Sequence, residues 1–309
     1  MVKIDLITGF LGSGKTTFLM KYARFLMDRG EKLGILEYDF GPINIDMVEL
    51  NKLRGPKCEI EMVAAACDED CLRRRFKTKL ISMAMSGYDR VIVEPSGIFD
   101  MDMFYDILRD DPLEQWYEIS NVIATVNANL EDDLSPEEEF VLASQAMSAG
   151  KILLTRTDIA TPERIENTKA RVLLAAEKIK CKKMDVSFID KPLAEFEEAD
   201  FIAIADSGYR INDYVKTIAG GVSSFSSVHT LEPPVGLENT KQKVDALFSD
   251  KKFGNIIRVK GFISDNGPCY QFNATRSEVS IAAKANGTPA LIIIGTNLDR
   301  EKILAFIGK

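Results

Sequence analysis

The first two thirds of the chain alternate short apolar runs with stretches of helical periodicity. Val2–Ile7 predicts a strand, and residues 18–26 carry apolar side chains at helical spacing, so a helix follows the strand. Gly30 is placed to end that helix, and Leu33–Glu37 predicts a second strand. The other predicted strands and helix of this part are Val91–Val93, Asn121–Val126, Ile152–Leu154 and the helix Cys71–Ser86. Strands that alternate with helices indicate an α/β fold with a doubly wound parallel sheet.

Two further helices begin at recognisable caps. Ser135 precedes Pro136, and Glu138 follows three positions after the serine, which is the pattern of a capping box. Thr161 followed by Pro162 repeats the serine–proline arrangement for another long helix.

The pattern changes after residue 219. Glycines and serines at 220–224 and the pair Pro233-Pro234 indicate a linker over about residues 220–235. The segments predicted beyond it are a helix at Asn239–Phe248, strands at Asn255–Ile263, Cys269–Asn273, Glu278–Ala282 and Ala290–Ile294, and a helix at Asp299–Ile307. We therefore expect two domains: residues 1–219, and a smaller α+β domain at residues 220–309.

Charge and composition narrow the class of protein. The chain has 309 residues, 46% of them hydrophobic, which is ordinary for a globular protein. Lys and Arg number 39 and Asp and Glu number 47, so the net charge is −8. This acidic balance argues against nucleic acid or an anionic membrane as the main partner.

The numbers of cysteines and histidines narrow the class of protein further. The five cysteines are an odd number, and no stretch resembles a signal peptide, so we expect reduced thiols and a cytoplasmic protein. His229 is the single histidine, which argues against a Ser-His-Asp triad and against a metal site built from several histidines.

A phosphate-binding loop follows the first predicted strand. Residues 9–16 read Gly-Phe-Leu-Gly-Ser-Gly-Lys-Thr and fit the pattern G-x-x-x-x-G-K-[ST]. Glycines allow backbone N–H groups to turn towards a phosphate, and the following helix adds its positive end. Lys15 would reach the β- and γ-phosphates, and the Thr16 hydroxyl would ligate Mg²⁺. The candidate nucleotide-binding residues here are Gly9, Gly12, Ser13, Gly14, Lys15, Thr16 and Thr17. The alternative is a glycine-rich turn without a ligand.

A carboxylate ends the predicted strand at residues 91–93. Glu94 stands where it can deliver a negative charge beside Mg²⁺ at the carboxyl edge of the sheet. Gly97, three residues later, is free to direct its N–H towards a γ-phosphate. The alternative is an ordinary turn from strand to loop.

A base-recognition element follows the strand at residues 152–154. Asp158 can accept from guanine N1–H and the 2-amino group, a match that adenine cannot make. Thr155 and Arg156 stand where a GTPase usually has asparagine and lysine; Thr155 retains a donor and the stem of Arg156 can cover a base. We therefore favour guanine over adenine, the alternative being that Asp158 caps a helix.

These segments resemble the CobW-type P-loop GTPases, relatives of the UreG and HypB metallochaperones. The resemblance covers nearly the whole chain. Its segments are Gly9–Thr17, the switch-like run from Tyr38 to Asp46, Glu94–Gly97, Gln145-Ala146 leading to Asp158, and the C-terminal strands Ile257–Phe262 and Ile294–Asp299. It implies a P-loop NTPase domain followed by a CobW-type C-terminal domain.

The resemblance also implies an activity. It implies a slow, Mg²⁺-dependent GTPase that binds GTP and GDP and serves a transition metal ion or a corrinoid. By this analogy Lys15, Asp39 and Glu94 are the catalytic residues, with Asp39 and Glu94 at the site of Mg²⁺ and water. The implied partner is a client metalloprotein or corrinoid protein, and a homodimer is left open.

A cysteine pair departs from the family pattern. The family commonly has Cys-x-Cys-Cys before the Glu94 strand, whereas this chain has Cys67-Asp68-Glu69-Asp70-Cys71. Cys67 and Cys71 are one helical turn apart, so both can face one ion, and with Asp70 and water they would suit Zn²⁺ or Co²⁺. The alternative is two reduced thiols at a helix start whose acids favour the helix dipole.

Two other functions are compatible with the phosphate loop. One is a nucleotide-gated scaffold that hydrolyses little; the other is a small-molecule kinase, which would need an acceptor site and a lid of arginines. Basic residues gather on the helix after Cys71, at positions 73–79, and we expect a solvated face there, with a partner-docking face as the alternative.

Overall fold

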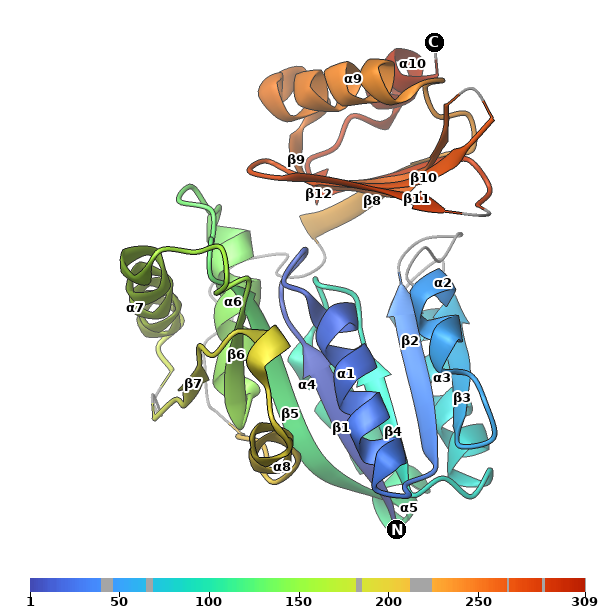
Figure 1. Cartoon of the computed structure of the whole chain (residues 1–309), viewed down its shortest axis with the longest axis vertical. Coiled ribbons are helices and arrows are strands. Elements are labelled where there is room, and N and C mark those ends of the chain that lie inside the picture. Colours follow the sequence, from blue (N-terminus) through green and yellow to red (C-terminus); the bar gives the residue numbers. More distant parts are fainter. Residues whose placement is uncertain are drawn as a thin grey trace. The chain divides into compact units, whose positions relative to one another are not determined.

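The structure is a computed structural model that describes residues 1–39, 47–64, 69–181, 185–211, 224–265, 267–284 and 287–308. The described residues divide into two compact units, the first reaching residue 211 and the second starting at residue 224 (Figure 1). The predicted domain boundary between residues 219 and 220 lies outside the described residues.

A parallel sheet forms the centre of the first unit. Seven strands are hydrogen-bonded in the order β3-β2-β4-β1-β5-β6-β7, and each pairing is parallel. Their bounds are β1 Val2–Thr8, β2 Leu33–Asp39, β3 Cys58–Ala64, β4 Arg90–Glu94, β5 Tyr117–Asn127, β6 Lys151–Thr155 and β7 Phe188–Ile189. The sheet confirms the predicted doubly wound α/β class. It also brings the ends of β1, β4 and β6, which carry the predicted motifs, to one edge.

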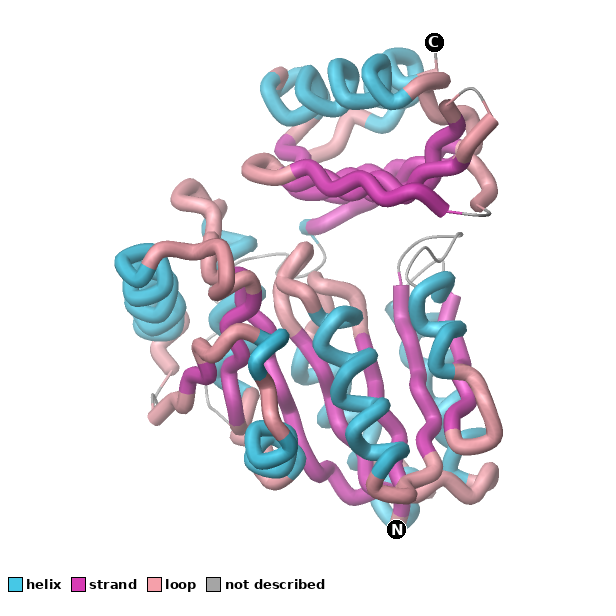
Figure 2. The backbone as a smooth tube through the Cα atoms, in the orientation of Figure 1, coloured by secondary structure: helices cyan, strands magenta, loops and turns pink. Residues whose placement is uncertain are grey.

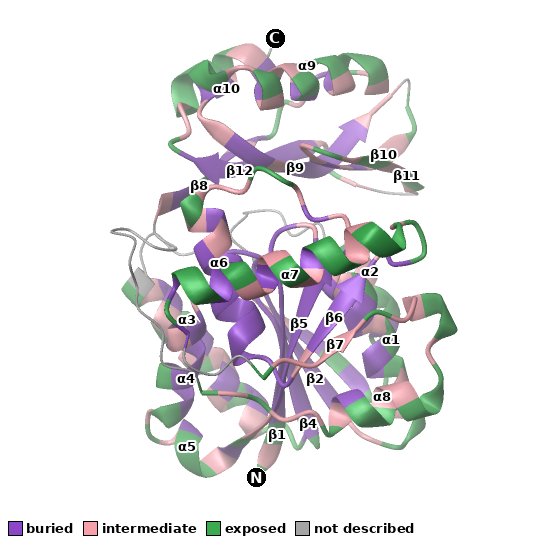
Figure 3. Cartoon of the chain, turned by 90° about the vertical axis from the view of Figure 1, so that its left-hand side faces the viewer, coloured by how far each residue is buried: buried purple, intermediate pink, exposed green. Residues whose placement is uncertain are grey.

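Helices lie on both faces of this sheet, and Figure 2 shows how they alternate with the strands along the chain. One face is covered by α1, α2 and α8, and the other by α3, α4, α5 and α6, with α7 packed beside α6 (Figures 1 and 3). Their bounds are α1 Lys15–Asp28, α2 Met47–Leu50, α3 Glu69–Ala84, α4 Met101–Arg109, α5 Leu113–Trp116, α6 Pro136–Ser148, α7 Pro162–Lys178 and α8 Glu198–Ala205.

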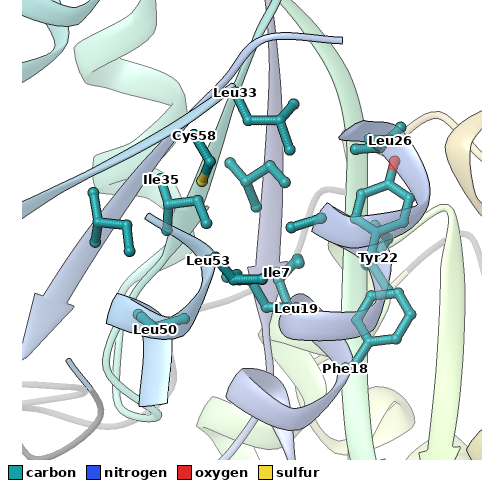
Figure 4. Packing of buried hydrophobic residues seen from close by; sticks show 14 of the residues in the cluster. Ile7, Phe18, Leu19, Tyr22, Leu26, Leu33, Ile35, Leu50, Leu53 and Cys58 are labelled. Atoms are coloured by element: carbon teal, nitrogen blue, oxygen red, sulfur yellow. The ribbon is translucent and has the colours of Figure 1, made fainter. Parts of the chain in front are cut away.

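The apolar stripe of α1 fixes this helix on the sheet. Phe18, Leu19 and Tyr22 are fully buried, and they belong to one cluster with side chains of the strands and of the α2 region (Figure 4). Burial of each large apolar side chain contributes about 1.5–3 kcal/mol, so the stripe holds the first residues of α1 at the edge of the sheet.

A buried ionic network joins strands β1, β4 and β5. Asp5 is fully buried and accepts hydrogen bonds from Arg90 Nη1 at 2.8 and 2.9 Å, from Asn121 and from the Tyr22 hydroxyl. Arg90 is 3% exposed and its Nε also donates to Glu31 Oε2 at 2.8 Å. Burial, together with the Asp5 carboxylate, raises the pKa of Tyr22. The charges are therefore compensated within the sheet.

Strand β3 was not predicted from the sequence. It reads Cys-Glu-Ile-Glu-Met-Val-Ala, and its two acids break the apolar run. In the structure Glu59 accepts from the Tyr88 hydroxyl and Glu61 pairs with Lys79, so both acids are satisfied by side chains from outside the strand. These partners are distant in sequence, which explains why the pattern alone gave no strand.

An antiparallel sheet with two helices forms the second unit. Its strand order is β11-β10-β9-β12-β8, and α9 and α10 lie on one face of the sheet (Figure 1). The bounds are β8 Phe225–Thr230, α9 Leu237–Ser249, β9 Asn255–Ser264, β10 Cys269–Thr275, β11 Val279–Lys284, β12 Ala290–Thr296 and α10 Arg300–Ile307. This confirms the prediction of a second domain with its own sheet.

The segment predicted as a linker is in part a strand. Residues 225–230 form β8, which pairs with β12 from Phe225↔Thr296 to Thr230↔Leu291. Phe225, Val228 and Thr230 are buried. The linker was predicted from the glycines and serines at 220–224 and from Pro233-Pro234, but residues 225–230 between these signals pair along a whole neighbouring strand.

Within the described ranges, no helix combines the length and the apolar character needed to span a bilayer.

Candidate nucleotide-binding site

The loop from Gly9 to Gly14 joins β1 to α1 at the carboxyl edge of the sheet. Gly9, Gly12 and Gly14 have φ values of 146°, 77° and 86°, a region that side-chain-bearing residues rarely adopt. A Cβ on Gly9 would lie 2.4 Å from the carbonyl oxygen of Thr125. The glycines predicted from the motif are therefore required by the backbone path itself.

Lys15 begins α1 and turns back over the loop. Its side chain is 7% exposed, and its Nζ donates to the carbonyl oxygen of Gly9 at 2.9 Å. The ammonium group is thus held across the concave side of the loop, where a phosphate would meet it together with the first N–H groups of the helix.

Hydroxyl groups from two other strands hold the loop from the side. Ser13 Oγ and Thr125 Oγ1 are 2.7 Å apart, and Thr125 Oγ1 also donates to the carbonyl oxygen of Thr8 at 3.3 Å. Thr155 Oγ1 donates to the carbonyl oxygen of Ser13 at 2.9 Å. Strands β5 and β6 therefore fix the shape of the loop between β1 and α1. The contribution of Thr125 was not predicted, and no motif in the sequence marks it.

Thr16 and Glu94 meet at the edge of the sheet. Thr16 Oγ1 donates to Glu94 Oε1 at 2.6 Å, and Glu94 is 4% exposed. A hydroxyl and a carboxylate are hard oxygen donors of the kind that Mg²⁺ prefers. The donor set therefore fits Mg²⁺, and the structure brings together the two residues that the sequence proposed for that ion.

Gly97 lies directly against the phosphate loop. A Cβ built on Gly97 would be 2.6 Å from the backbone nitrogen of Leu11 and 2.8 Å from its Cα. Any larger residue would push the two segments apart. The loop after β4 and the loop after β1 are therefore in close contact.

The predicted base-recognition residues lie just beyond β6. Thr155 is buried at 7% exposure, with its hydroxyl directed to Ser13 rather than outward. Arg156 has a φ of 59°, which turns the chain sharply, and Asp158 is exposed in the turn that follows. Thr155 thus supports the phosphate loop, while the contact between Asp158 and a base stays a prediction.

Two acidic residues lie at the end of β2. Asp39 is the last residue of β2; it pairs in register with Ala64, and its side chain lies outside the described part of the structure. Glu37 is 2% exposed and stands in register with Glu94 on β4. Sequence reasoning missed Glu37, although a glutamate inside an apolar strand is a visible signal. The switch-like run after Asp39, to Asp46, lies outside the described residues.

Two of the three predicted transition-metal ligands, Asp70 and Cys71, lie in the first turn of α3. Cys67 is outside the described residues, Asp70 is exposed and Cys71 is half-buried. Among the residues that are described, no group of three or more His, Cys, Asp and Glu side chains is arranged to hold a metal ion. Burial raises the pKa of the Cys58 thiol to about 11, so that group remains protonated near neutral pH.

The basic face of α3 is partly neutralised. Arg73 and Lys77 lie 3.6 and 3.3 Å from Asp110, and Lys79 pairs with Glu61. These pairs are consistent with a solvated helix face that is tied to its neighbours.

Fold and site together define the class. A phosphate loop between β1 and α1, a buried lysine over it and a threonine–glutamate pair at the edge of a doubly wound parallel sheet are the features of a P-loop nucleotide-binding protein.

Comparison with known families identifies the group. Residues 3–182 match the family described as CobW/HypB/UreG, nucleotide-binding domain, and residues 227–308 match the cobalamin synthesis protein cobW C-terminal domain. The chain belongs to the CobW/HypB/UreG family, as its motifs predicted.

The individual relatives share less than 30% sequence identity with this chain. The zinc chaperone YjiA of Escherichia coli is 28% identical over an alignment of 183 residues that covers 55% of this chain and 54% of that protein. The zinc-regulated GTPase metalloprotein activator 1 of Dictyostelium discoideum is 22% identical over 304 residues, covering 84% of this chain and 62% of that protein. The matches thus span about half to three fifths of these relatives. The structure of Zn(II)-bound YjiA from E. coli aligns over 99% of this chain and 97% of that chain, with 19% identity and a TM-score of 0.36.

Proposed function

We propose that this protein binds GTP with Mg²⁺, hydrolyses it slowly to GDP and phosphate, and uses this cycle to deliver a transition metal ion to a client protein. The observation that carries the nucleotide part is the pair Thr16 Oγ1 and Glu94 Oε1, 2.6 Å apart, beside the loop that Lys15 closes. Family membership and the names of the relatives support the choice of GTP and of a metal.

The residues of the site have distinct tasks in this proposal. Backbone N–H groups of the loop and Lys15 bind the β- and γ-phosphates and offset their charge. Thr16 and Glu94 would hold Mg²⁺, which supplies charge neutralisation at the phosphate oxygens when bound. Asp39 and Glu94 would orient the attacking water, and Gly97 would direct its N–H to the γ-phosphate. Asp158 would recognise guanine.

Zinc is the proposed metal, because the curated relatives are named as zinc chaperones and as a zinc-regulated activator. Cys67, Cys71 and Asp70 are the proposed ligands, since two thiolates and a carboxylate suit Zn²⁺. Co²⁺ and a corrinoid client form the second version of this proposal. It rests on the resemblance alone, and it predicts that Co²⁺, titrated in place of Zn²⁺, changes the turnover rate.

Product and metal dependence test the function. We expect wild-type protein with GTP and Mg²⁺ to release free phosphate, and Zn²⁺ to change the turnover rate. Cys67→Ser/Cys71→Ser should abolish the zinc effect and keep the basal rate, whereas the control Cys269→Ser, on a strand of the second unit, should behave like wild type.

Three results would contradict the proposal. A phosphorylated acceptor in place of free phosphate would indicate a kinase. Tight GTP binding without turnover, with or without metal, would indicate a scaffold. Zinc affinity that is equal with no nucleotide, with GDP and with a GTP analogue would separate metal binding from the cycle, because coupling between two ligands is reciprocal.

A further inference from the structure

Gln145 is a buried polar residue that the phosphate-binding mechanism above does not use. Its side chain is on α6 and is 1% exposed. Its Nε2 donates to the carbonyl oxygen of Gly97 at 3.2 Å and to that of Phe99 at 3.4 Å. One amide group therefore holds two backbone carbonyls of the loop after β4, more than forty positions earlier in the chain.

Helix α6 is a fixed platform for this side chain. It begins with a capping box in which Ser135 accepts from the N–H of Glu138 while the Glu138 side chain accepts from the N–H of Ser135. From Phe140 to Ser148 every residue is buried, and Figure 3 shows the helix largely in the colour of buried residues. A polar group on such a helix has little freedom to move, so it can position what it contacts.

Other elements also contact the loop at residues 96–99. Gly97 abuts the phosphate loop at Leu11. The ring of Phe99 is 5.9 Å from that of Tyr38 at the end of β2 and 6.3 Å from that of Phe76 on α3. Phe99 N–H donates to the carbonyl oxygen of Ser96 at 3.1 Å, which closes a turn. The conformation of residues 96–99 thus depends on the phosphate loop, on β2, on α3 and on Gln145.

The second polar atom of Gln145 adds a further feature. Its Oε1 is buried and accepts no hydrogen bond in the described part of the chain. A buried acceptor without a donor raises the free energy of this conformation, and a shift of the loop that turned a backbone N–H towards Oε1 would remove that penalty.

We infer that Gln145 is a positioning residue that sets the conformation of residues 96–99 and thereby the preference of the site for a triphosphate over a diphosphate. The inference rests on the proposed function, since it assigns Gly97 to the γ-phosphate. Gln145 acts through the carbonyls of Gly97 and Phe99, and by holding these two carbonyls it fixes the backbone on either side of Ile98.

Gln145→Met tests the inference, because methionine keeps nearly the same length and volume and removes both hydrogen bonds. The matched control is Ser144→Ala on the same helix, where a buried hydroxyl that donates only within the helix, to Val141 at 3.0 Å, is removed. The measurements are calorimetric dissociation constants for GDP and for a non-hydrolysable GTP analogue with Mg²⁺, and amide hydrogen exchange over residues 96–99.

We expect Gln145→Met to weaken binding of the GTP analogue roughly three- to tenfold relative to GDP, about the contribution of one neutral hydrogen bond. Amide exchange over residues 96–99 should become faster in this variant. Ser144→Ala should leave both the affinity ratio and the exchange unchanged.

The opposite results would overturn the inference. Equal weakening of GDP and the analogue would mean that Gln145 acts on the fold as a whole, and an unchanged ratio would mean that the loop is positioned without it. If the methionine variant does not unfold cooperatively, Gln145→Leu, which also lacks the donor and introduces no charge, takes its place. Failure of wild-type protein to bind guanine nucleotide would instead overturn the proposed function.

Discussion

Thr16 Oγ1 donates a hydrogen bond of 2.6 Å to Glu94 Oε1, although the two residues are 78 positions apart. The helix α1 supplies the hydroxyl and the end of strand β4 supplies the carboxylate. The contact exists because β4 pairs directly with β1, whose end leads into the phosphate loop. Two motifs recognised separately in the sequence are therefore parts of one site.

This pair gives the first prediction. Glu94→Gln removes a charged oxygen from the Mg²⁺ donor set. The increase in the rate of GTP hydrolysis on addition of Mg²⁺ should therefore be smaller than in wild type by a factor of about ten or more. The measurement is turnover over a Mg²⁺ titration. Glu118→Gln, an exposed glutamate on β5, is the control and should match wild type. An unchanged Mg²⁺ dependence in Glu94→Gln would remove Glu94 from the ion site.

Lys15 gives the second prediction. Lys15→Ala removes the buried ammonium group over the loop, and loss of a charged hydrogen bond costs about 1.5–3 kcal/mol, or roughly 10- to 150-fold in affinity. Calorimetric titration with GTP measures it. Lys21→Ala is the control, since Lys21 lies on the same helix with its Nζ exposed and bonded to Leu193. Unaltered GTP affinity in Lys15→Ala would disprove the assignment of the phosphate loop.

Asp158 gives the third prediction. Wild type should bind GDP more tightly than ADP, and Asp158→Asn should reduce that ratio about tenfold or more, because the amide cannot accept from both guanine donors. Competition binding with GDP and ADP measures the ratio. Glu163→Gln changes a nearby exposed acid and should keep the preference. Equal affinity of wild type for the two nucleotides would refute guanine specificity.

The buried network at Asp5 gives the fourth prediction. Arg90→Met leaves the fully buried Asp5 carboxylate without its cation, and breaking such a pair costs about 3–5 kcal/mol of unfolding free energy. Urea unfolding measures the change. Arg29→Met breaks the ion pair with Glu198, whose side chains are 50% and 71% exposed, and should cost less than about 1 kcal/mol. Similar losses of unfolding free energy in both variants would mean that the buried Asp5–Arg90 pair contributes no more to stability than an exposed ion pair.

Much of the candidate site could be predicted from the sequence because its parts are local. The phosphate loop is a run of eight residues whose glycines and lysine serve one backbone path, and the strand before it and the helix after it were visible in the apolar pattern. The capping box at Ser135 and Glu138 was predicted for the same reason and is confirmed by both of its hydrogen bonds. The ligand-binding and catalytic roles of the site residues remain predictions; for Asp39, Cys67 and the linker boundary, the side chains or segments also lie outside the described residues.

Other features depend on which strands become neighbours. Thr125 and Thr155 hold the phosphate loop only because β5 and β6 follow β1 in the sheet, and the sequence around them carries no motif for that contact. The apolar pattern predicted no strand at residues 58–64 because its acids find partners far along the chain, and residues 225–230 looked like a linker until they were paired with β12.

The sequence by itself determined the class of fold, the phosphate loop and the family, because each follows from spacing within a short segment. Only the tertiary structure decided that Thr155 supports the loop instead of facing the base, that Glu37 lies beside Glu94, and that Gln145 reaches Gly97 and Phe99. The physical reason is that these contacts join residues tens of positions apart. The spacing of residues within one segment does not show which other segment will lie next to it, because that depends on the order of the strands in the sheet.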